Sequence, residues 1–145
     1  MTHSMRTLIL RTDAIPLAFF GLSGITMDLL GYCAGIGAWK DVFLNNPLAI
    51  GAVEAHGLAI IIAVLLIRHA AAQDTTTWHV TAVAVHLLLG ICNLVFWQVF
   101  IDVAIAPIGV VATAYHFVFI IANGAALFLT RLSPEIASAM PKTGE

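Results

Sequence analysis

The chain carries few charged side chains. Of its 145 residues, Lys and Arg account for 6 and Asp and Glu for 8, a charged fraction of 10%, whereas soluble domains have about 25%. The net charge is −2 and no basic run occurs, which excludes the electrostatic footprint of a nucleic-acid-binding protein. Hydrophobic residues make up 61% of the chain, more than a small soluble domain can bury. The composition therefore predicts a membrane protein.

Cysteine and local catalytic motifs are equally scarce. Cys33 and Cys92 form no CxxC pair and lie in apolar segments, as small core residues do. The sequence contains no glycine-rich phosphate loop, nucleophile elbow or transporter-like repeat. No His/Cys cluster has zinc-ligand spacing. We therefore predict no metal site from the sequence.

Four apolar segments are long enough to cross a bilayer: 16–39, 47–67, 78–101 and 107–130. About 20 helical residues span the roughly 30 Å of hydrocarbon. In lipid the backbone must pair within a helix or a closed barrel, and these segments lack a barrel's period of two. We predict an all-α polytopic membrane protein, an up-down bundle of four transmembrane helices formed by residues 15–132.

The basic residues predict the orientation of these helices. One side of the bundle receives Arg6, Arg11, Arg68, Arg131 and Lys142, and the other receives only Lys40. Because cytoplasmic loops are enriched in Lys and Arg, both termini are expected in the cytoplasm, with the protein in the inner membrane. Residues 1–14 would then form a cytoplasmic N-terminal segment, and residues 133–145 a flexible cytoplasmic tail.

Ionisable residues interrupt the apolar segments. A charge at the bilayer centre costs about 2.5–3.5 kcal/mol on insertion scales, so such residues usually face a protein interior. With a rise of about 1.5 Å per residue, five polar side chains fall in one layer of the outer half: Asp28, Glu54, Asn93, Tyr115 and His116. His86 falls in a separate inner layer, and His69 and His79 lie at the cytoplasmic interface without an assigned role.

The shared layer is the candidate site. Asp28 and Glu54 would exchange protons with a substrate, and His116 with Tyr115 would polarise it. The remaining polar and aromatic residues near these helix faces are assigned to substrate binding: His56, Asn93, Trp97, His86, Asn123 and Tyr32. A lipophilic, quinone- or isoprenoid-like molecule entering from the membrane lipid suits such a site.

Three alternatives use the same residues differently. The carboxyl and imidazole groups would serve as interhelical hydrogen bonds only. A stripe of small residues around Asp28 (Gly21, Gly24, Gly31 and Gly35) would dock the chain, as a non-enzymatic accessory subunit, on a larger membrane complex or on a second copy. His56 and His116 would ligate a b-type haem. The sequence does not decide whether the protein is an enzyme.

Several features resemble the DoxX-like superfamily of small four-helix bacterial membrane proteins. They are Arg11-Thr12-Asp13 at the start of the first helix, its glycines, and Val53-Glu54-Ala55-His56-Gly57-Leu58 early in the second. The resemblance covers most of residues 8–130 as a hydropathy pattern, but the segment from His86 to Trp97 has no counterpart in it. It implies a helical membrane fold and, because the superfamily includes a thiosulfate:quinone oxidoreductase subunit, an oxidoreductase complex. It assigns no functional residue.

Overall fold

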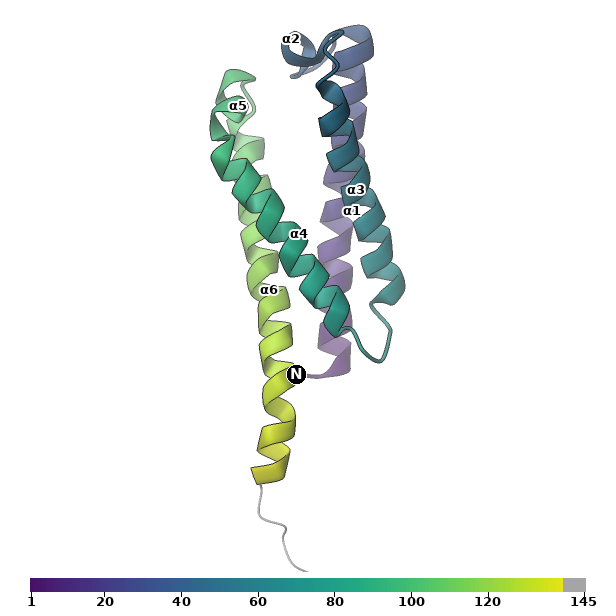
Figure 1. Ribbon diagram of the computed structural model, residues 1–145, viewed down its shortest axis with the longest axis vertical. Helices are drawn as coiled ribbons and strands as arrows, with labels where there is room; N and C mark the ends of the chain where they lie inside the picture. The colour runs from purple at the N-terminus through teal and green to yellow at the C-terminus, as the bar shows by residue number, and fades with distance from the viewer. Residues whose placement is uncertain (140–145) are drawn as a thin grey trace, which may run out of the picture.

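A computed structural model describes residues 1–139, with side chains to residue 130 (Figure 1). The elements are α1 (His3–Ala34), α2 (Lys40–Phe43), α3 (Ala49–His69), α4 (Thr76–Val95), α5 (Trp97–Asp102) and α6 (Ala106–Ala139). Four of these helices, α1, α3, α4 and α6, are long and apolar enough to cross a membrane. The predicted helical class and the predicted number of long helices are therefore confirmed for the described part of the chain.

The four long helices form two pairs. α1 packs along α3 and α4 packs along α6, whereas few contacts join one pair to the other. In Figure 1, α4 runs obliquely from the lower ends of α1 and α3 towards α5, and the pairs diverge towards the end that carries α2 and α5. The start of α1 lies at the opposite end, and α6 continues beyond it (Figure 1).

The first helix begins earlier than the sequence analysis predicted. α1 starts at His3, where the Met5 N–H donates to the Thr2 hydroxyl (3.3 Å), and it continues through Pro16. Proline is tolerated inside apolar helices when neighbouring groups satisfy the backbone. The predicted helix start at Pro16 was therefore wrong, whereas the cytoplasmic placement of residues 1–14 stays a prediction. α1 ends before Gly35, which adopts the left-handed conformation (φ 62°) that favours glycine.

Two further boundaries differ from the prediction. The third apolar segment is divided at Phe96 into α4 and the short helix α5. The last helix continues to Ala139, into the segment predicted as a flexible tail from Ser133. The rest of that tail, 140–145, lies outside the described residues.

Glycines bring α1 and α3 into close contact. A Cβ on Gly21 would lie 2.9 Å from the His56 carbonyl oxygen, and one on Gly24 would lie 2.3 Å from the His56 ring. Gly31 packs against Trp39 in the same way, at 3.2 Å. The stripe that was expected to dock a partner is therefore covered by the chain's own residues.

Small and branched apolar side chains fill the rest of the space between the helices. The buried cluster consists of Leu10, Ala14, Leu17, Ala59, Ala63, Leu66, Ala70 and Ala82. Alanine is frequent at such contacts because helices that lack bulky side chains approach closely and gain dispersion energy.

Replacing Gly24 by alanine tests the α1–α3 contact. The added methyl group must displace the His56 ring, so Gly24→Ala should lower stability by about 1–3 kcal/mol, measured as a lower melting temperature in detergent. Gly51→Ala is the matched control, since nothing lies within 4 Å of a Cβ at that position. Equal melting temperatures for the two variants would contradict the observed packing.

Candidate functional site

A buried carboxyl group joins the two helix pairs. Asp13 of α1 is fully buried, and its Oδ1 lies 2.6 Å from Nε2 of His86 on α4. From α6, the Asn123 amide donates to Asp13 Oδ2 (2.9 Å), and the Tyr115 hydroxyl lies 3.0 Å from Oδ1 and 2.7 Å from the Asp13 carbonyl oxygen. An ionised carboxylate is an acceptor only, and here three potential donors surround it. Asp13 is thus the meeting point of α1, α4 and α6.

A second imidazole extends this group. Nδ1 of His86 lies 2.9 Å from Nδ1 of His116, and both side chains are buried. When Nε2–H of His86 donates to Asp13, a neutral His86 accepts at Nδ1 from His116, whereas a protonated His86 donates to His116. A single proton can therefore occupy either ring. Asp13, His86 and His116 form a carboxylate–imidazole–imidazole series.

Asn123 carries a second branch of hydrogen bonds. Its amide oxygen lies 2.7 Å from Nδ1 of His79, and its amide nitrogen also donates to the Phe119 carbonyl oxygen (2.9 Å). Because an amide oxygen only accepts, Nδ1 of His79 is the donor. Asn123 therefore orients His79 and Asp13 on either side of it, but an amide does not readily hand a proton from one to the other.

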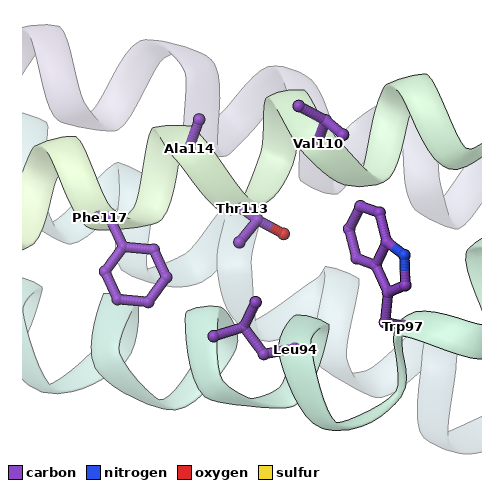
Figure 2. A pocket seen from close by; sticks show the side chains of 6 residues that line it. All are labelled: Leu94, Trp97, Val110, Thr113, Ala114 and Phe117. Carbon is purple, nitrogen blue, oxygen red and sulfur yellow. The ribbon is translucent and has the colours of Figure 1, made fainter.

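A mostly apolar groove of about 500 Å³ lies beside the imidazole series, between the ends of α4 and α6. Figure 2 shows Trp97 and Phe117 at its two ends, with Thr113 and Leu94 facing each other between them; Val110 and Ala114 complete the lining. The buried Thr113 hydroxyl has no hydrogen-bond partner among the described residues. His116 follows Thr113 by one turn, about 4.5 Å along the axis, and retains 8% exposure.

A separate acid–imidazole pair joins α1 and α3. The buried Asp28 places Oδ2 2.6 Å from Nδ1 of His56, while its Oδ1 is enclosed without a partner in the described residues. Asp28 lies about 22 Å from Asp13 along α1, at about 1.5 Å per residue. The prediction that Asp28 and His116 share one layer was wrong, because α1 begins at His3 and therefore presents Asp13, not Asp28, to α4 and α6.

Some of the other predicted site residues lie in the Asp13 cluster, and others lie outside it. His116 and Tyr115 lie together as predicted, but Glu54 is exposed and makes no hydrogen bond or ion pair recorded among the described residues. His86, predicted in a separate inner layer, lies in the cluster with His116. Asn123 belongs to the same cluster.

Besides His56, which pairs with Asp28, three predicted substrate-binding residues lie outside the cluster. Trp97 lines the groove between α4 and α6. Tyr32 is partly exposed and lines a different hollow of about 370 Å³ between the C-terminal end of α1 and the start of α3. Asn93 is partly buried and has no recorded hydrogen bond in the described part of the chain.

Sequence reasoning missed Asp13 and His79. Asp13 was placed outside the first span because Pro16 was taken as its start, although apolar residues already begin at Leu8. His79 lies seven residues before His86, on the same face of α4, and this spacing was the signal that indicated a buried role.

The haem alternative does not fit this geometry. His56 belongs with Asp28 and His116 with Asp13, and these carboxyls are about 22 Å apart along α1. Axial ligands must approach one iron from its two sides, so His56 and His116 do not form such a pair. Within the described residues, no group of three or more His, Cys, Asp or Glu side chains is arranged to hold a metal ion.

Removing the Asp13 carboxylate tests its role at the junction. Asp13→Ala leaves His86, Tyr115 and Asn123 without their shared acceptor, and removing one partner of a buried pair typically costs about 3–5 kcal/mol. The purified Asp13→Ala variant should therefore unfold at a lower concentration of denaturing detergent than the unmodified protein. Glu54→Ala removes an exposed carboxyl of the same charge and should change stability by less than about 0.5 kcal/mol. A change in stability of equal size for both variants would contradict the role of Asp13 at the junction of the helix pairs.

Comparison with protein-family models, curated proteins and solved structures finds no match to this chain. The resemblance to the DoxX-like superfamily therefore stays a prediction, and function must be argued from the site itself.

Proposed function

We propose that the chain is a multi-pass protein of the inner membrane, an up-down bundle with both termini in the cytoplasm. Four helices of sufficient length and hydropathy support membrane insertion. The bundle end that carries the start of α1 and the α3–α4 connection also carries Arg6, Arg11 and Arg68, which favours the cytoplasm for that end.

We further propose that the protein binds a lipophilic small molecule in the groove between α4 and α6 and exchanges a proton with it through His116. The observation that carries this proposal is the buried series Asp13–His86–His116 ending one turn from the unpartnered Thr113 hydroxyl. Intramembrane ionisable groups are costly and usually mark a functional site. The groove supplies apolar walls and few polar groups, as ligand sites commonly do.

The series allows a balanced proton transfer. In the starting state His86 is protonated and donates from Nδ1 to Nδ1 of His116, which carries its own proton on Nε2. The ligand oxygen takes the Nε2 proton while His116 receives the His86 proton at Nδ1, so one proton moves from His86 to the ligand. Asp13 stabilises the protonated His86, and Tyr115 and Asn123 hold the Asp13 carboxylate in place.

The class of ligand follows from the lining of the groove. Trp97, Phe117 and Leu94 suit an apolar body, and the Thr113 hydroxyl suits one oxygen atom on it. A quinone- or isoprenoid-like molecule has this combination. His116, one turn further along α6, is not itself in the lining. In the quinone case the same proton transfer would accompany reduction by an external electron donor.

A second candidate function is that of an accessory subunit. Glu54 is exposed on α3 within an apolar span, a position that is costly in lipid unless a partner covers it. This alternative places the docking face on α3 instead of the glycine stripe of α1, and a larger membrane complex or a second copy would provide the cover.

Blocking the groove tests ligand binding. Ala114→Trp adds an indole at the groove wall, so lipophilic molecules that co-purify with the protein in mild detergent should be lost from the extract analysed by mass spectrometry. Ala125→Trp adds the same group at another exposed position of α6 outside the groove and should retain them. Identical extracts from both variants and the unmodified protein would argue against a ligand in this groove.

Proton transfer is tested separately from binding. His116→Gln should keep the co-purifying molecule and the melting temperature of the protein. The rate at which the protein converts that molecule by proton transfer should fall by about 10²–10⁴-fold, the usual contribution of a general acid or base. Tyr115→Phe keeps the ring and removes one donor to Asp13, so a smaller loss is expected. Loss of folding along with activity in His116→Gln would favour the purely structural role.

A further inference from the structure

Three residues at the place where α1 meets the start of α4 each bury a polar atom without a partner. These atoms are Nε of Arg6, Oγ1 of Thr75 and Nε2 of His79, each enclosed and without a hydrogen bond in the described residues. All three residues are at least nine-tenths buried. An unpaired buried polar group costs about 1–3 kcal/mol, so three on neighbouring residues point to a ligand that pairs with them.

Two contacts place these residues next to one another. Thr75 and His79 are joined by a backbone hydrogen bond of 3.0 Å, one turn apart. The Arg6 guanidinium donates to the hydroxyl of Thr76, the residue after Thr75 (3.2 Å). Thr75 occupies the N-cap position of α4, yet its hydroxyl makes no capping hydrogen bond, although capping is the usual role of threonine there.

The three atoms are complementary to one water molecule. Nε–H of Arg6 is a donor, and Nε2 of His79 is an acceptor because its Nδ1–H donates to Asn123. The Thr75 hydroxyl is both. A water that accepts from Arg6, donates to His79 and exchanges one bond with Thr75 makes the three hydrogen bonds typical of buried water.

An anion fits this place less well, because the chain already provides one. Oδ1 of Asp74 accepts from the Thr76 N–H (2.8 Å) and lies 4.0 Å from the Arg6 guanidinium. Hydrogen bonds from the Thr76 side chain and backbone lower the pKa of Asp74, so this carboxylate stays ionised at neutral pH. The positive charge of Arg6 and of the helix start is therefore already balanced.

We propose that Arg6, Thr75 and His79 bind one ordered water, and that this water connects the buried polar cluster to the aqueous phase at the N-terminal end of α1. Asp74, whose side chain is 78% exposed, lies at the outer side of this connection. Through this water, Nε2 of the neutral His79 ring is in hydrogen-bond contact with solvent.

Asn123 links this water site to the buried cluster. Its amide oxygen accepts from Nδ1 of His79, and its amide nitrogen donates to Asp13 Oδ2. A water that holds the His79 ring in place therefore also helps to position Asn123 beside Asp13. The water site itself does not rest on the proposed function of the groove.

Water contact at His79 can be measured directly. The protein, labelled with ¹⁵N at its histidines and reconstituted in phosphatidylcholine vesicles, is analysed by solid-state NMR with magnetisation transfer from water. His79→Gln identifies the His79 signals. The His79 ring should gain intensity as fast as the partly exposed His69, whereas His86, whose two ring nitrogens are bonded within the protein, should gain it severalfold more slowly.

Two threonine variants complete the test. Thr75→Val removes the hydroxyl and should slow the transfer to His79 severalfold, whereas Thr113→Val removes an equally unpartnered hydroxyl in the groove and should leave it unchanged. Transfer to His79 as slow as to His86 would overturn the proposal, as would a chloride-dependent His79 shift without water transfer. If Thr75→Val does not fold, the comparison of His79 with His86 in the unmodified protein decides. Failure of ligand binding in the groove would leave these results unaffected.

Discussion

The hydrogen bonds to the Asp13 carboxylate hold this fold together as one unit. α1 with α3 and α4 with α6 are pairs stabilised by close apolar packing, but few contacts connect them. His86, Tyr115 and Asn123 all reach across to Asp13 from the second pair. Apolar surfaces have little preference for one another over lipid tails, so a polar junction determines which helices associate and at what height.

The same chemistry occurs twice on α1 with different surroundings. Asp13 has several hydrogen-bond partners and a second imidazole behind the first, whereas Asp28 has His56 and one enclosed oxygen without a partner. Because His56 is held between Asp28 and the space left by Gly24, this second pair fixes the distance between α1 and α3. The Asp13 group ends at His116, one helical turn from Thr113 in the groove between α4 and α6, and we therefore propose that function lies there.

The number of long helices could be predicted from the sequence because hydropathy depends only on which residues follow one another. The meeting of side chains depends on where each helix begins and how it is rotated, and one residue turns a helix by about 100°. Treating Pro16 as a start moved the whole of α1 along its axis and assigned to Asp28 the position that Asp13 occupies. The burial of Arg6 was not predicted either, because buried arginines are rare. Its hydrogen bond to Thr76 joins distant parts of the chain and cannot be inferred from the local sequence. His116 and Tyr115 were predicted to act together, and this proximity could be predicted because they are neighbours on a single helix.

The long separation in sequence between Asp13 and its partners has a consequence for biogenesis. The chain is made from its N-terminus, so α1 and α3 are complete before the residues that bond Asp13 have been synthesised. In the proposed membrane setting, the Asp13 carboxyl must be protonated, hydrated near the membrane surface or shielded by the insertion machinery until Tyr115 and Asn123 emerge from the ribosome. The α1–α3 pair and the α4–α6 pair can therefore form their polar junction only after α6 has been synthesised.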